Sequence, residues 1–247
     1  RPHGILLVTG PTGSGKSTTL YASLNRIVSE AVKAVTIEDP VEYHVEGVNQ
    51  IQVNAAIGMT FAAGLRAILR HDPDIIMIGE IRDLETAEAA VQASLTGHLV
   101  FSTLHTNDAA GATTRLLDMG IEPFLVASSV EAILAQRLVR RVCESCLRRR
   151  EMTAAELPEG LEPPADGMVV EAPGCRECRR TGFRGRVGAF ELLRMTDSIR
   201  DLVVSRADAT RIRKVAYAEG ELDLLRNAAW DLARAGITTP AEAMRVV

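Results

Sequence analysis

The chain has 247 residues, which is enough for one large domain or for a main domain with a smaller one. Its 47% hydrophobic and 24% charged residues are ordinary for a globular protein, and its net charge of −4 argues against a dedicated nucleic-acid binder. No apolar run approaches the roughly 18 residues of a membrane-spanning helix, and no signal peptide is recognisable. Because the first residue is Arg1, we expect the chain to be the C-terminal portion of a longer protein.

The first motif is a glycine-rich segment between an apolar run at 5–8 and a helical pattern at 16–29. Its spacing, G-x-x-x-x-G-K-S, is that of the P-loop, and the flanking strand and helix argue against a chance glycine-rich turn. The glycines let backbone N–H groups curl around phosphate oxygens, while Lys16 reaches the β- and γ-phosphates and Ser17 holds Mg²⁺. The sequence therefore predicts a nucleoside-triphosphate site formed by Gly10, Pro11, Thr12, Gly13, Ser14, Gly15, Lys16, Ser17 and Thr18.

Strand-like runs alternate with helical patterns through the first hundred residues. The strand-like runs lie at 5–8, 35–37, 75–78 and 99–101, and the further helical patterns at 62–70 and 86–94. Near-continuous apolar strands that alternate with helices predict a mainly parallel sheet covered on both faces. Residues 42–53 alternate in polarity and predict a short β-hairpin.

The second half of the chain has other patterns. Residues 131–142 favour a helix, the proline-rich stretch 151–173 favours a loop, 186–193 alternates like a strand, and the pattern is helical from Asp197 onward.

From these patterns we predict an α/β protein with three parts. They are a RecA-like P-loop core with a mainly parallel sheet over 1–142, a small tetracysteine insert over 143–186 and a C-terminal helical subdomain over 187–247.

Two of the predicted strands end in acidic residues. Glu80 follows the strand at 75–78 in the Walker B arrangement, which puts a carboxylate near Mg²⁺ at the carboxyl edge of the sheet. Three carboxylates, at Glu38, Asp39 and Glu42, follow the strand at 35–37. A solvated acidic loop is the alternative, but like charges clustered at a strand end resist ionising together, which favours metal or water handling.

Two histidines mark the two ends of the strand near residue 100. His98 at its start is interpreted as structural, whereas His105 at its end lies beside Thr103 and Thr106, where the phosphates are expected.

Together these motifs resemble those of the secretion and type IV pilus motor ATPases. The resemblance rests on the P-loop, on the acidic segment 38–42, on the run 69–83 (LRHDPDIIMIGEIRD) and on the segment 97–106, and it extends over essentially the whole chain. It is greatest for the type II secretion motors, with the pilus-extension ATPases close behind.

The resemblance implies ATP and Mg²⁺ as cofactors and assigns roles to individual residues. Lys16 and Ser17 bind phosphate and Mg²⁺, and Glu80 supports the Mg²⁺ shell. Glu42 is similar to the glutamate that polarises the attacking water, and His105 to the γ-phosphate sensor.

The resemblance also implies a cytoplasmic homo-hexamer, peripheral to the inner membrane, that docks on platform proteins of that membrane and powers pseudopilus assembly. Arginines contributed across subunits would complete its sites; Arg66, Arg70 and Arg82 are local candidates, or they pair with nearby acids. Two alternatives stay open, a type IV pilus extension motor and a nucleotide-controlled binding module with little hydrolysis.

The four cysteines form two C-x-x-C pairs separated by 28 residues, which is a strong signal for a tetrathiolate zinc site. Disulfides are the alternative, but a P-loop enzyme works where thiols stay reduced. Four thiolates leave no open position for chemistry, so we expect a structural Zn²⁺ bound by Cys143, Cys146, Cys175 and Cys178.

A basic segment surrounds these cysteines, with eleven arginines against eight acidic residues between 137 and 186. The segment suits nucleic acid, anionic lipid or an acidic partner, or it pairs with its own acids. Because Phe183 is its lone aromatic residue, base stacking has no support, and we favour anionic lipid and membrane-side proteins over nucleic acid.

Overall fold

The computed structural model describes residues 3–247. Its strands are β1 (Gly4–Thr9), β2 (Ala34–Glu38), β3 (Val48–Gln52), β4 (Ile75–Ile78), β5 (Leu99–Leu104), β6 (Val130–Val142), β7 (Arg148–Glu151), β8 (Met168–Glu171) and β9 (Phe183–Arg194). Its α-helices are α1 (Lys16–Ile27), α2 (Phe61–Ile68), α3 (Leu84–Leu95), α4 (Ala109–Asp118), α5 (Pro123–Ser129), α6 (Asp197–Val204), α7 (Ala209–Ala218), α8 (Leu225–Arg234) and α9 (Pro240–Arg245).

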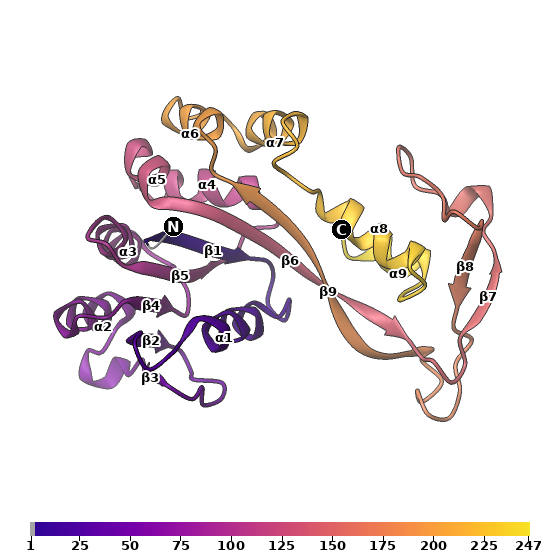
Figure 1. Cartoon of the computed structure of the whole chain (residues 1–247), viewed down its shortest axis with the longest axis horizontal. Coiled ribbons are helices and arrows are strands. Elements are labelled where there is room, and N and C mark those ends of the chain that lie inside the picture. Colours follow the sequence, from indigo (N-terminus) through magenta and orange to yellow (C-terminus); the bar gives the residue numbers. More distant parts are fainter. Residues whose placement is uncertain (1–2) are drawn as a thin grey trace. The chain divides into compact units, whose positions relative to one another are not determined.

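The main sheet has the order β3-β2-β4-β5-β1-β6-β9, and its strands from β3 to β6 can be followed in Figure 1. Strand β1 lies between β5 and β6 and pairs in parallel with both, and β4 pairs in parallel with β5 and β2. The predicted α/β fold with a mainly parallel sheet is confirmed, as are the four strands and three helices predicted in the first hundred residues.

Helices cover both faces of this sheet. On one face, Leu20 and Leu24 of α1 pack in a core with Val8 of β1 and Met77 of β4. On the other face, α2 approaches β2 so closely that a Cβ on Gly64 would lie 1.9 Å from the end of the Ile37 side chain. Because both faces are covered, the strands carry apolar residues on both sides, which explains their near-continuous apolar runs.

The predicted hairpin over 42–53 is wrong. Strand β3 within it pairs in parallel with β2, with Ala34 opposite Val48, so residues 39–47 form a connection to a parallel neighbour. The alternation in this segment reflects an edge strand with one covered face.

The helix predicted over 131–142 is also wrong, because these residues belong to the 13-residue strand β6. The buried residues Val130, Ile133, Val139 and Val142 are spaced by multiples of three, which imitates a helical face. Strand β6 pairs in parallel with β1 from Val130 to Ala135, with a register shift between Ile5 and Leu6. Pairing with the edge of β1 that β5 leaves free therefore outweighs the helix propensity of these residues.

The loop predicted over 151–173 contains one strand and the end of another. Strand β8 pairs antiparallel with β7, Arg148 opposite Glu171, around an irregular segment at 152–167. The strand predicted at 186–193 and the helices predicted beyond Asp197 are present as β9 and α6 to α9.

The structure divides into two compact units, each of which combines two separate stretches of the chain. The first unit comprises residues up to 135 together with 192–222, and the second comprises 136–191 together with 223–247. Helices α6 and α7 belong to the first unit, where they contact α5 and α4, and Arg213 forms an ion pair with Asp108. Within residues 3–247, no helix has the length and apolar character needed to cross a membrane.

Candidate nucleotide and metal sites

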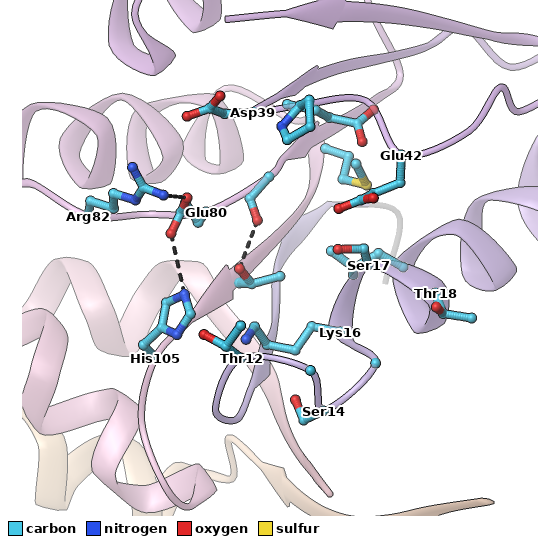
Figure 2. A pocket seen from close by; sticks show the side chains of 18 of the residues that line it. Thr12, Ser14, Lys16, Ser17, Thr18, Asp39, Glu42, Glu80, Arg82 and His105 are labelled. Atoms are coloured by element: carbon cyan, nitrogen blue, oxygen red, sulfur yellow. Dashed lines mark hydrogen bonds and ion pairs between the residues drawn. The ribbon is translucent and has the colours of Figure 1, made fainter. Parts of the chain in front are cut away.

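The P-loop joins β1 to α1 directly. Gly15 adopts a left-handed conformation, φ 88°, immediately before the first turn of α1, and glycine tolerates that conformation at no steric cost. Lys16 Nζ donates to the carbonyl oxygens of Gly10 at 2.8 Å and Pro11 at 3.2 Å. Residues 12–18 line a cavity of about 580 Å³, so the N-terminus of α1 with its partial positive charge forms part of the wall (Figure 2).

Side-chain hydrogen bonds hold the neighbouring strand ends together beside this loop. Thr103 Oγ1 donates to the Gly79 carbonyl at 2.7 Å, Ser102 Oγ donates to the Ile78 carbonyl at 2.9 Å, and Thr9 Oγ1 accepts from the Thr106 N–H at 2.9 Å. These bonds join the ends of β1, β4 and β5, where the chain leaves the sheet. The residues that follow each strand are thereby fixed relative to the P-loop.

Glu80 lies at this edge and is 9% exposed. Its carboxylate forms an ion pair with Arg82, and His105 Nε2 lies 3.4 Å from Glu80 Oε2 (Figure 2). The hydrogen bond to Glu80 raises the pKa of Arg82 further above its usual value. A carboxylate that lines the cavity suits a Mg²⁺ shell, and contacts with Arg82 and His105 keep it in place.

The three carboxylates after β2 separate into two environments. Glu38 is buried, and its carboxylate accepts hydrogen bonds from Tyr21 Oη, from Thr36 Oγ1 at 2.5 Å and from Gln50 Nε2 at 3.1 Å. Asp39 and Glu42 are exposed and line the cavity, with a cis peptide bond between Asp39 and Pro40. Glu42 and Asp39 are therefore accessible to solvent and ligands, whereas the carboxylate of Glu38 is engaged in hydrogen bonds within the protein.

The structure brings most of the predicted site residues to one cavity. Its wall includes residues 12–18, Glu42, Glu80 and His105, and the carbonyls of Gly10 and Pro11 contact Lys16 from the loop itself. Arg82 also lines the cavity, whereas Arg66 forms an exposed ion pair with Glu85 at 2.7 Å.

Tyr21 is a further residue of the site that no sequence motif predicts. It is fully buried on α1, one turn after Ser17, and it contacts the connection at 39–47, which carries Asp39 and Glu42 and which we call the acidic loop. A tyrosine on the apolar face of the P-loop helix was the available signal, because a buried phenol needs a hydrogen-bond partner.

The four cysteines gather in the second unit as predicted. Their Sγ atoms all lie within 4.8 Å of one another, and none is in a disulfide. The backbone N–H groups of Cys175 and Gly182 donate to Cys178 Sγ at 3.1 and 3.3 Å and lower the pKa of that thiol to about 6, although burial opposes ionisation. A glycine is required at 182, because φ is +79° and a Cβ would lie 2.2 Å from the Ala172 carbonyl oxygen. Four convergent sulfurs with N–H donors behind them are compatible with a tetrahedral zinc site.

The basic segment around the cysteines pairs in part with its own acids. Arg150 forms ion pairs with Glu156 at 2.5 Å and Glu171 at 3.2 Å, and its hydrogen bond to Glu156, together with those from Thr153, lowers the pKa of Glu156 to about 2. Three further ion pairs join arginines of the segment to acids of the segment: Arg141 with Glu144, Arg149 with Asp166 and Arg184 with Glu177. Exposed arginines remain on the turn of the second cysteine pair, at 176, 179 and 180.

Comparison with known proteins identifies several relatives. The family described as "Type II/IV secretion system protein" matches residues 1–245. "Type II secretion system protein E" of Pseudomonas aeruginosa is 53% identical over 247 residues, which is 100% of this chain and 49% of that protein. "Type IV pilus assembly ATPase PilB" of Myxococcus xanthus is 51% identical over 224 residues, 89% of this chain and 40% of that protein. The chain thus spans about half the length of these curated relatives, or less.

Solved structures show the same fold. The pilus retraction motor PilT with bound ADP is 30% identical, with a TM-score of 0.70, and the match covers 99% of this chain and 61% of that chain. The ATPase DotB of Legionella pneumophila, at 24% identity and a TM-score of 0.70, covers 100% of this chain and 60% of that chain. The mainly parallel α/β arrangement is therefore shared with the pilus retraction motor PilT and the ATPase DotB.

Proposed function

The chain belongs to the family of type II/IV secretion system proteins, and from this premise we propose that it hydrolyses ATP as the motor segment that powers pseudopilus assembly in type II protein secretion. The observation that carries the proposal is the meeting of the P-loop, Glu42, Glu80 and His105 in one cavity. A P-loop alone is compatible with many nucleotide-binding proteins, but the added carboxylates and histidine provide the groups that hydrolysis needs.

Each of these residues has a role that its position supports. The P-loop N–H groups and Lys16 would cradle the phosphates of ATP, and Ser17 with Glu80 would hold Mg²⁺, which when bound would supply positive charge beside the phosphates. Glu42 is the exposed carboxylate on the cavity wall and orients the attacking water, and His105 contacts the γ-phosphate. Catalysis then comes from positioning and charge stabilisation.

We assign Zn²⁺ to Cys143, Cys146, Cys175 and Cys178. The closed set of four sulfurs supports a structural ion, and the second unit has a small core that gains from such a crosslink.

Assembly and location are part of the same proposal. The chain acts within a homo-hexamer in the cytoplasm, peripheral to the inner membrane, where platform proteins of the secretion machine dock. Arg82 in the cavity is the local arginine of the site, and others come from neighbouring subunits. The exposed arginines at 176, 179 and 180 support contact with an anionic surface, and because Phe183 is the lone aromatic residue of the basic segment, anionic lipid is favoured over nucleic acid.

Type IV pilus extension is the second candidate, because the pilus assembly ATPase of M. xanthus is 51% identical over 224 residues. Pull-down of inner-membrane partners separates the two machines.

The test is Mg²⁺-dependent phosphate release from the chain alone and from the chain fused to a hexamer-forming domain, with Glu80→Ala as the blank. We expect release that rises on hexamerisation, because sites completed between subunits need the ring. Tight nucleotide binding without release in either form would contradict the proposal and favour a nucleotide-controlled binding module.

A further inference from the structure

Tyr21 links the P-loop helix to the loop that carries Glu42. Its hydroxyl donates to Glu38 Oε2 and accepts from the Glu42 backbone N–H at 3.2 Å. Tyr21 is on α1, one turn after Ser17, so a single phenol oxygen joins the helix that begins in the phosphate-binding loop to the acidic loop opposite.

The carboxylate of Glu38 continues this link on its other oxygen. Gln50 Nε2 donates to Glu38 Oε1 at 3.1 Å and to the Tyr43 carbonyl at 3.2 Å, while Gln50 Oε1 accepts from the Val45 N–H at 2.8 Å. The acidic loop is thus bound at residues 42, 43 and 45 by one connected set of hydrogen bonds. We call Tyr21, Glu38 and Gln50 the Tyr21 network.

The phenol is suited to this position because it stays protonated. Burial, followed by the hydrogen bond to Glu38, raises the pKa of Tyr21 well above its usual value. The hydroxyl therefore keeps its proton and donates it to Glu38, and its oxygen is left to accept from the Glu42 N–H. The ring also packs edge-on against Tyr43, with centroids 4.6 Å apart.

We propose that Tyr21 is a positioning residue for hydrolysis, which fixes the backbone of Glu42 relative to the P-loop through the Tyr21 network. This inference rests on the proposed function, in which Glu42 orients the attacking water. Tyr21 is fully buried in the core with Leu20 and Leu24 and is not among the residues that line the cavity, so it acts through Glu42.

The alternative is that Tyr21 contributes packing alone, since its ring belongs to the core formed by α1 and the sheet. Tyr21→Phe separates these roles because it keeps the ring and removes the oxygen. In the hexamer-forming fusion described above, we expect kcat to fall on the order of 10-fold, with the KM for ATP and the affinity for ADP changed by less than about twofold, because a misplaced base slows chemistry and leaves the phosphate cradle intact.

Tyr217→Phe is the matched control, since Tyr217 is a half-exposed tyrosine on α7, remote in sequence from every residue of the site. Unchanged kcat in Tyr21→Phe, or equal losses of kcat and ADP affinity, would overturn the proposal. Absence of phosphate release from the unsubstituted protein would instead overturn the proposed function, so the two failures are distinguishable.

A second variant tests whether the residues act together. Gln50→Leu removes the other half of the network at similar volume, and we expect it to lower kcat in the same direction. If the network acts as one unit, Tyr21→Phe combined with Gln50→Leu reduces kcat by no more than about twice the larger single loss. A combined loss equal to the product of the two single losses would show independent effects and contradict the shared network.

Discussion

The polar groups of the nucleotide site stand at the ends of parallel strands in the first unit, whereas those of the second unit converge from turns and helix faces. Glu80 and His105 follow β4 and β5, whose ends are joined by hydrogen bonds from Ser102 and Thr103. The second unit instead gathers four cysteines and buries Glu242, which accepts from Arg140 and Arg245. Its hydrophobic core is small and centres on Trp230, whose indole N–H donates to the Glu162 carbonyl at 2.8 Å.

In the first unit, the backbone of a large covered sheet places the side chains of the site at the strand ends. A small hydrophobic core, as in the second unit, needs crosslinks and buried charge pairs for its stability. Substitutions that remove ligands or charges should therefore weaken the second unit most, and substitutions in the first unit should reduce turnover without loss of structure.

Removal of the metal site has the largest expected effect. Cys178→Ser should abolish binding of about one Zn²⁺ per chain and expose residues 136–191 to hydrogen exchange, because a structural zinc site contributes on the order of 10 kcal/mol to the fold it closes. ADP affinity, which depends on the first unit, should change by less than about threefold. Metal analysis and exchange mass spectrometry measure both, with the exposed Ser145→Ala as control. Retention of zinc by Cys178→Ser would refute the assignment.

Glu42→Gln should reduce kcat by about 100-fold or more, because a neutral amide no longer polarises the attacking water. ADP binding should persist, since the P-loop is unchanged. Glu46→Gln on the same loop is the matched control, because Glu46 is exposed and lies outside the cavity wall. Full turnover in Glu42→Gln would exclude Glu42 as the base.

Glu242→Gln should destabilise the fold by about 2 kcal/mol at pH 7, because it removes the buried carboxylate that Arg140 and Arg245 share, although these arginines are 46% and 58% exposed and remain solvated. Burial raises the pKa of Glu242, but hydrogen bonds from Arg245 and Arg140 outweigh it and lower the pKa to about 2. The folded-state pKa lies below the unfolded one, so the stabilisation is present above pH ~4.5 and is lost as the pH falls toward about 2.

Urea unfolding of wild type and Glu242→Gln at several pH values measures this difference, and the gap should close between these two limits. Glu159→Gln, an exposed site in the same unit, should show no such gap. A difference that is independent of pH down to 2 would contradict the charge-pair explanation.

Arg66→Ala has the smallest expected effect. Its ion pair with Glu85 joins side chains that are 53% and 62% exposed, so water and salt screen the attraction. We expect a loss of less than about 0.5 kcal/mol in the free energy of unfolding, which disappears at high salt. A large fall in phosphate release from the hexameric fusion, without a fall in stability, would assign Arg66 to a neighbouring subunit's site.

Local patterns in the sequence were sufficient to predict the nucleotide site and the cysteine cluster. The P-loop spacing defines its own turn and helix start, because the glycines and Lys16 act within eight consecutive residues. The two C-x-x-C pairs likewise predicted the sulfur cluster, since each pair brings two thiols together whatever the surrounding fold. Residues that follow strands, such as Glu80 and His105, could be assigned to one edge because parallel strands end on the same side.

The remaining features depend on contacts between segments that are far apart in the sequence. Residues 131–142 favour a helix by composition, yet they form a strand because β1 has a second edge whose backbone groups need partners from a segment more than 120 residues away. The acidic loop also depends on long-range contacts. Glu38 is buried whereas Glu42 is exposed, and the Tyr21 hydroxyl forms hydrogen bonds with both residues. Hydrogen bonds between residues that are distant in sequence do not affect the local periodicity of the sequence. They can therefore be identified only in the folded structure.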